Sequence, residues 1–250
     1  MKAVLYILIM LLGSLTFAQD NNAIFEQANT LYNNGKYAEA IDKYQSILDD
    51  GMHSSELFFN LGNAHYKLNH VGPSVYYFEK ALQLAPNDKD IKNNISYARN
   101  MTIDAIDVVP EVGLSKVLKN ITSVLTFDGW AITTVILFLI FVVLFISYYF
   151  SEYTTRKRIA FTTSVIVLGL GFLTLFFAFH NYNLKLKDNP AIVFVHESEV
   201  KSEPNLSSQE AFVLHEGTKV QVLDTVNNWK KIKLSDGKTG WISSSDIKVL

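Results

Sequence analysis

Residues 57–87 read LFFNLGNAHYKLNHVGPSVYYFEKALQLAPN, and this stretch decides the organisation of the N-terminal part of the chain. Its apolar side chains recur at helical spacing, and Pro86 stands where a helix has to end. Residues 24–48, IFEQANTLYNNGKYAEAIDKYQSIL, carry the same pattern 34 positions earlier. The alignment predicts two copies of one helix–turn–helix unit, over residues 21–54 and 55–88.

The residue types within this unit indicate how its helices pack. Small residues let the two helices of a pair approach closely, and large residues fill the space between them. The small residues are Ala28, Ala40, Gly62 and Ala81, and the large ones are Tyr44, Leu61 and Phe78. These offsets resemble the tetratricopeptide repeat, which implies stacked helix pairs that bind other proteins. Asp90–Asn100 is expected to form a capping helix, so the domain covers residues 21–103.

The first helix of each pair lines the concave face in repeats of this type. Aromatic side chains alternate there with amides, which suits an extended peptide, although packing between repeats would use the same aromatic residues. Both interpretations stay open for Tyr32 and Tyr66, whereas Asn29 and Asn63 favour the groove. The candidate partner-binding residues are Phe25, Asn29, Tyr32, Asn33, Phe59, Asn63, Tyr66, Lys67, Asn93 and Tyr97.

Two later stretches, residues 130–150 and 159–179, contain no charged residue. As helices of this length they would each rise about 32 Å, which matches the hydrocarbon core of a bilayer. Trp130 and Tyr148 lie at opposite ends of the first stretch, where interfacial aromatic residues belong. The sequence predicts a two-helix transmembrane hairpin, with a buried helix hairpin of a soluble protein as the alternative.

The N-terminus and the hairpin loop together predict the topology. Residues 1–18 combine an early lysine, an apolar stretch and a small-x-small end, which is typical of a secretory signal peptide, with an uncleaved anchor as the alternative. The loop 151–158 carries Arg156, Lys157 and Arg158, and positive charge in a short loop indicates the cytoplasmic side. Both soluble domains are therefore expected in the periplasm, on a protein of the bacterial inner membrane.

Residues 104–129 link the repeats to the hairpin. Apolar residues recur there at roughly helical spacing, with Lys116 and Lys119 among them. This pattern is typical of a helix that lies on a membrane surface, and a helix packed against the repeats would show it too.

Residues 190–250 change to the short alternating runs and turn signals of an all-β domain. Five or six strands are expected, and Ser198–Ser208 is expected to be an exposed loop. The combination of Glu216-Gly217-Thr218, Trp229, Asp236-Gly237 and Gly240-Trp241-Ile242 resembles a bacterial SH3-like small barrel. Trp229 and Trp241 are the candidate ligand surface for a peptide or cell-wall glycopeptide, and packing in the core is the alternative for both.

The amino-acid composition excludes several kinds of functional site. The chain of 250 residues has no cysteine, which excludes thiolate zinc sites, iron–sulfur clusters and cysteine nucleophiles. Its net charge of −2 offers no basic footprint for nucleic acid. The six histidines are dispersed, and the sequence contains no H-E-x-x-H, Walker A or G-x-S-x-G motif. No catalytic residue, cofactor or metal is therefore predicted.

The sequence as a whole predicts a multidomain membrane protein. It would consist of an all-α tetratricopeptide-repeat solenoid, a two-helix transmembrane hairpin and an all-β SH3-like small barrel. This order of parts resembles the BatE family of the Bacteroidetes aerotolerance operon. The resemblance implies a protein of the inner membrane that acts beside von Willebrand-type membrane proteins and a MoxR-type ATPase.

The predicted function is that of a non-enzymatic scaffold. Its periplasmic repeats would bind protein or peptide partners, and its hairpin would meet the lipid bilayer and other membrane components of a Bat-type complex. The alternative is a cell-envelope sensor or anchor that binds peptidoglycan peptides through the SH3-like domain.

Overall fold

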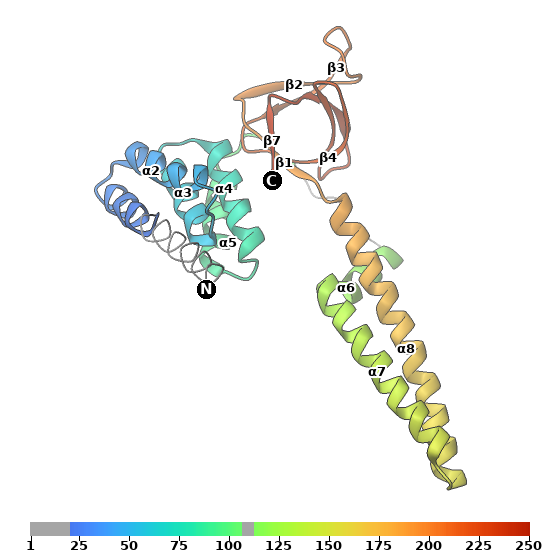
Figure 1. Cartoon of the computed structure of the whole chain (residues 1–250). Helices are drawn as coiled ribbons and strands as arrows, with labels where there is room; N and C mark the ends of the chain where they lie inside the picture. Colours follow the sequence, from blue (N-terminus) through green and yellow to red (C-terminus); the bar gives the residue numbers. More distant parts are fainter. Residues whose placement is uncertain (1–20, 107–112) are drawn as a thin grey trace, which may run out of the picture. The chain divides into compact units, whose positions relative to one another are not determined.

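The computed structural model describes residues 21–106 and 113–250, which belong to two compact units (Figure 1). One unit combines Met1–Val108 with Asn189–Leu250, and the other is Val109–Asp188. The predicted signal peptide lies outside the described residues. The second unit is thus an insertion in the polypeptide of the first.

The first unit begins with helical hairpins. Residues 21–33 are helical, and the helices that follow are α2 (Tyr37–Asp49), α3 (Ser55–Lys67), α4 (Val71–Leu84) and α5 (Lys89–Arg99). The Ser54 hydroxyl accepts a hydrogen bond from the Leu57 amide at 3.1 Å and so caps α3. The Asp88 carboxylate caps α5 in the same way, through the amides of Asp90 and Ile91. Two helix pairs and one further helix are therefore present, at the predicted places.

The pattern of small and large residues explains the packing of these helices. A Cβ atom on Gly62 would lie 2.7 Å from the Phe78 ring, so only glycine lets α4 come this close to α3. Tyr44 and Phe78 are both buried between helices. Burial raises the pKa of Tyr44 to about 12, which keeps its phenol protonated and able to donate a hydrogen bond.

The C-terminal part of the first unit is a seven-stranded antiparallel sheet in the order β3-β2-β6-β5-β4-β1-β7. Figure 1 shows its strands curling round a common interior. The strands are β1 (Pro190–Val193), β2 (Glu197–Lys201), β3 (Glu210–His215), β4 (Lys219–Val226), β5 (Trp229–Lys233), β6 (Thr239–Ser243) and β7 (Ile247–Val249).

The expectation of an exposed loop over Ser198–Ser208 is wrong in its first half, because β2 extends to Lys201. Ser198 and Val200 face the interior of the sheet and are buried, while their neighbours are polar. Because β2 contains a single apolar residue, its sequence shows almost no apolar–polar alternation, and no strand was predicted there.

The last repeat helix packs directly on the first strand of the sheet. A Cβ atom on Gly72 of α4 would lie 2.9 Å from the carbonyl oxygen of Val193 in β1, so the two backbones come very close here. Ile192 is fully buried and belongs to the core of the repeats. The Phe194 ring meets Tyr76 edge-on, with ring centroids 5.4 Å apart. The first strand therefore contributes to the core of the repeats, while the interior of the sheet has a core cluster of its own.

Two carboxylates bind the helical part to the sheet. Glu79 of α4 is 4% exposed and contacts the guanidinium of Arg99 at 2.6 Å and the ammonium of Lys219 at 2.8 Å. Asp104 accepts hydrogen bonds from the His215 amide at 2.7 Å and the Thr218 hydroxyl at 2.6 Å. Its other oxygen lies 2.7 Å from the Nδ1 atom of the His215 ring.

The second unit contains α6 (Leu114–Thr122) and two long helices, α7 (Phe127–Phe150) and α8 (Thr154–Lys187). These two helices extend beyond the predicted spans, 130–150 and 159–179. The predicted loop 151–158 is largely helical, because α8 begins at Thr154 and its first turns contain Arg156, Lys157 and Arg158. The Arg156 guanidinium lies 5.0 Å from the centre of the Tyr153 ring, and such contacts hold cations beside an aromatic belt.

Small and hydroxyl-bearing residues join α7 to α8. The hydroxyls of Thr134 and Thr174 lie 2.9 Å apart in the buried interface. A Cβ atom on Gly171 would come within 3.0 Å of the Phe138 ring, which again marks a close helix contact. In the most apolar stretch of each helix only 6% (α7) and 17% (α8) of the residues are buried. Two helices this long, apolar and exposed fit a membrane protein.

The predicted helix within residues 104–129 forms as α6 and belongs to the hairpin unit. The Trp130 indole donates a hydrogen bond to the Thr122 carbonyl at 2.9 Å. The Asn181 amide of α8 donates to the carbonyls of Thr122 and Leu125, at 2.8 and 3.1 Å. These bonds hold the end of α6 against the hairpin, while Leu114 and Val117 stay exposed.

The Asp104 contacts lead to a pH-dependent prediction. Burial alone would raise the pKa of Asp104, but the hydrogen bonds from Thr218 and His215 outweigh it and lower the pKa. A carboxyl group with a lowered pKa stabilises the fold above its unfolded-state pKa, and this contribution is lost as pH falls through the folded-state pKa. We therefore expect Asp104→Asn to destabilise the first unit at pH 7, by about 1–3 kcal/mol.

The difference in unfolding temperature between Asp104→Asn and wild type is expected to shrink below about pH 4, as the wild-type carboxyl takes up its proton. Thermal unfolding of the full chain in detergent micelles, followed by tryptophan fluorescence, measures it. Asp42→Asn, on the exposed side of α2, is the control. A difference that persists unchanged at about pH 3 would contradict the role given to Asp104.

Candidate binding surfaces

The first helices of the repeats line an open pocket of about 280 Å³, which we call the groove pocket. It is formed by the helix at residues 21–33 together with α3, α4 and α5. Its lining residues are Tyr32, Asn63, Tyr66, Lys67, Phe78, Asn94 and Tyr97. The pocket therefore combines aromatic faces, amides and one cation, with no carboxylate among the lining residues.

Amide side chains form an inter-repeat ladder beside this pocket. Asn60 donates a hydrogen bond to the Asn29 side-chain oxygen at 3.0 Å, and Asn94 donates to Asn63 at 2.7 Å. The Tyr44 hydroxyl also donates to Asn29, at 2.7 Å. Because their oxygens accept bonds from the next repeat, Asn29 and Asn63 take part in packing whatever else they bind.

Five of the ten predicted groove residues line the pocket, namely Tyr32, Asn63, Tyr66, Lys67 and Tyr97. The structure places the other five elsewhere. Phe25 packs on Tyr44 with ring centroids 5.7 Å apart, and Phe59 packs on Phe78 at 5.8 Å. Asn29 belongs to the amide ladder, while Asn33 and Asn93 are exposed outside the pocket.

The groove prediction missed two amides, Asn60 of the amide ladder and Asn94, which belongs to the ladder and also lines the pocket. Asn94 lines the pocket, whereas the sequence predicted Asn93, the residue immediately before it on α5. A signal for it exists in the sequence, because Asn60 and Asn94 are 34 positions apart, like Asn29 and Asn63. Equal spacing of two amide pairs indicates contacts between successive repeats.

The charge state of the groove pocket follows from its surroundings. Burial and the neighbouring Tyr37 raise the pKa of Tyr32, so its phenol is neutral and can donate or accept a hydrogen bond. Lys67 and Tyr97 are exposed at the edge of the pocket, Tyr97 to 60%. This arrangement can hold peptide groups with amides and tyrosines, and it can attract an acidic side chain with Lys67.

Trp229 and Trp241 lie on the outer face of the sheet, which we call the tryptophan face. Their neighbours Ile232 and Ile242 point inward and are fully buried, whereas both tryptophans are half-buried and belong to neither core cluster. Lys231 is opposite Trp241 in the ladder, and its ammonium lies 5.9 Å from the centre of that indole. The face therefore presents two flat aromatic surfaces beside a cation.

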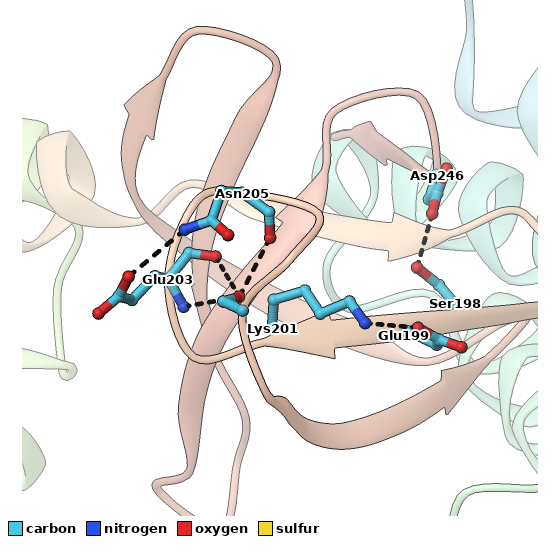
Figure 2. Close-up of polar contacts among 7 residues, drawn as sticks. Ser198, Glu199, Lys201, Glu203, Asn205 and Asp246 are labelled. Carbon is cyan, nitrogen blue, oxygen red and sulfur yellow. Dashed lines mark hydrogen bonds and ion pairs between the residues drawn. The ribbon is translucent and has the colours of Figure 1, made fainter.

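The loop after β2 borders this face, because Lys201 is also paired with Trp241. Figure 2 shows this loop with Glu203 and Asn205. The Ser208 hydroxyl donates to the carbonyls of Glu203 and Asn205 at 3.0 and 3.1 Å. Glu199 forms an ion pair with the Lys201 ammonium at 2.6 Å. Leu206 stands at the loop with 85% of its surface exposed. A loop with internal hydrogen bonds and an exposed apolar residue thus follows the strand that is paired with Trp241.

Two parts of the chain match known families. Residues 55–88 match the tetratricopeptide repeat, and residues 198–248 match the bacterial SH3 domain. The chain therefore carries a tetratricopeptide repeat and a bacterial SH3 domain, as the sequence predicted. A search of curated proteins found no match to the chain. The match to the SH3 domain begins after β1, the strand that packs on the repeats.

The matched domains are binding modules rather than catalytic ones. Across residues 21–106 and 113–250, no three His, Asp or Glu side chains come together as a metal site would require. The arrangement of the groove pocket and the tryptophan face is suited to recognising peptide groups and aromatic or apolar side chains.

Proposed function

We propose that the protein is a non-enzymatic scaffold of the inner membrane, whose periplasmic repeats bind a protein or peptide partner in the groove pocket. The observation that carries this proposal is the pocket itself, in which Tyr66, Lys67 and Tyr97 leave polar and aromatic surface open to a ligand. Tetratricopeptide repeats are protein-interaction modules, which supports a partner of this kind. The resemblance to the BatE family favours an aerotolerance-type envelope complex as the setting.

The test changes only residues that do not hold the repeats together. Asn29 and Asn63 are unsuitable, because their substitution would break the amide ladder. We expect Lys67→Ala/Tyr97→Ala to lower the recovery of crosslinked periplasmic partners by about tenfold, the loss for one or two buried contacts. Quantitative mass spectrometry after crosslinking in cells measures the recovery.

The matched control is Lys43→Ala/Gln83→Ala, which removes two exposed side chains from the second helices of the pairs. It should recover partners like wild type. Equal recovery by both double variants, with unchanged unfolding temperatures, would rule out the groove pocket as the binding site.

A second candidate function is recognition of peptidoglycan peptides by the tryptophan face. The observation that favours it is the outward position of Trp229 and Trp241 beside Lys231, because such faces bind sugar and peptide groups by stacking. Bacterial SH3 domains are known as peptide- or peptidoglycan-binding modules, which supports this candidate.

We expect Trp229→Ala to weaken the binding of soluble peptidoglycan fragments by roughly tenfold, the value of about one stacking contact. Calorimetric titration of the full chain in detergent micelles measures the affinity. Thr225→Ala, an exposed position on β4, is the control that should bind normally. Wild-type protein that binds no fragment at millimolar concentration would exclude this candidate.

We infer a topology in which both soluble parts are periplasmic and the hairpin turn is cytoplasmic. The basic residues Arg156, Lys157 and Arg158 support this orientation. In spheroplasts, a protease added outside is expected to digest residues 21–106 and 189–250, while a cysteine introduced at Ser151 stays unlabelled by an impermeant reagent. Labelling at that position, or protection of the repeats from the protease, would contradict the proposed orientation.

A further inference from the structure

A second pocket lies between the repeats and the last strand of the sheet. Its volume is about 300 Å³, and we call it the lysine pocket. The lining residues come from α2 and the turn after it, from α3, α4 and β7. They are Gln45, Leu48, Gly51, Met52, His53, Phe58, Tyr76, Tyr77, Lys80 and Lys248. None of them lines the groove pocket, so the two sites are separate.

Two ammonium groups share one aromatic ring in the lysine pocket. The Nζ atom of Lys248 lies 4.7 Å from the centre of the Tyr76 ring, and that of Lys80 lies 5.7 Å from the same centre. Within the described chain, neither ammonium forms an ion pair or a hydrogen bond. Like charges that are held together without a counter-charge repel each other, and an anion between them would relieve the repulsion.

The charge of Lys248 also acts on neighbouring groups, in addition to the effect of burial. Burial, and then the charge of Lys248, lower the pKa of Lys80. Lys248 also contributes to the pKa of His65, which burial and His70 lower to about 4. No carboxylate lines the pocket. The nearby Asp49 lies outside the lining, where its carboxylate accepts a hydrogen bond from the Gln45 amide at 3.1 Å and its charge acts on Tyr77.

The rest of the lining is apolar or aromatic. Leu48, Met52, Phe58 and Tyr76 offer side-chain surface that would cover an apolar group. Gln45 is held in place, since its oxygen accepts a hydrogen bond from the Tyr77 hydroxyl at 2.9 Å. The volume is at the lower end of the range for small-molecule sites, and it suits the last one or two residues of a peptide.

We propose that the lysine pocket binds the C-terminal carboxylate of a peptide with an apolar last residue. Lys80 and Lys248 would hold the carboxylate, and the apolar lining would cover the last side chain. The site is composite, because Lys80 belongs to the repeats and Lys248 to the SH3-like domain. It needs both parts in their packed arrangement, and it does not depend on the function proposed for the groove pocket.

The test uses acetylated tetrapeptides that end in Ala, Leu or Phe, each as the free acid and as the C-terminal amide. Competition against a fluorescein-labelled free acid, read by fluorescence anisotropy, measures binding to the full chain in detergent micelles. We expect at least one free acid to bind roughly tenfold more tightly than its amide, the difference made by a charge-assisted contact.

Lys80→Gln and Lys248→Gln should each weaken binding of the free acid by roughly tenfold and leave the amide unaffected. Lys92→Gln, an exposed lysine on α5, is the matched control and should bind like wild type. Unfolding temperatures identify any variant in which the repeats and the SH3-like domain have separated. Lys80 contacts the Tyr76 ring of its own helix, so we expect its substitution to leave the interface with the sheet intact.

Three outcomes would overturn the proposal. Equal binding of acid and amide peptides would show that the carboxylate is not recognised. Binding of the free acid by both lysine variants as by wild type would show that the site lies elsewhere. Displacement of the labelled peptide by inorganic phosphate as efficiently as by the free acids would show that the pocket is a general anion site.

Discussion

The buried carboxylate of Glu79 connects three parts of this protein. It receives Arg99 from the capping helix and Lys219 from the sheet, so three elements meet at one side chain. A buried charge without its partners costs several kcal/mol, and each partner here comes from a different part of the chain. The capping helix, the last repeat and the SH3-like domain are therefore stabilised together rather than one after another.

This connection changes the meaning of the two binding modules. Ile192 fills the core of the repeats, and Gly72 allows the backbone of β1 to contact α4. The two modules consequently belong to one compact unit, which carries the groove pocket, the lysine pocket and the tryptophan face. A ligand that loosens the packing at one of them would alter the others.

Much of the fold was predictable because it depends on local patterns. The 34-residue period, the charge-free stretches and the turn signals each report a repeating geometry within a short window. The Gly62–Phe78 contact is an example, since the repeat pattern places a small residue and a large one at fixed positions of the unit. The site was predictable only to the level of the helix face, so that Asn93 was chosen where Asn94 lines the pocket.

The missed features depend on contacts between distant residues. Asp104 and Glu79 look like ordinary surface acids in the sequence, and their partners, His215 and Lys219, lie more than a hundred residues later. The strand β2 was missed for a related reason, because its burial comes from neighbouring strands rather than from its own composition. Lys80 and Lys248 form a pair only after the repeats and the sheet have packed together.

The inserted hairpin has a consequence for biogenesis. The repeats are synthesised first, yet β1, which supplies Ile192 to their core, follows only after α7 and α8. Until that strand arrives, the face of α4 that receives it stays uncovered. The repeats of a nascent chain therefore remain incompletely packed. The first unit can finish folding only after both hairpin helices have been synthesised. A completely folded first unit is therefore found only in chains whose whole hairpin has been synthesised.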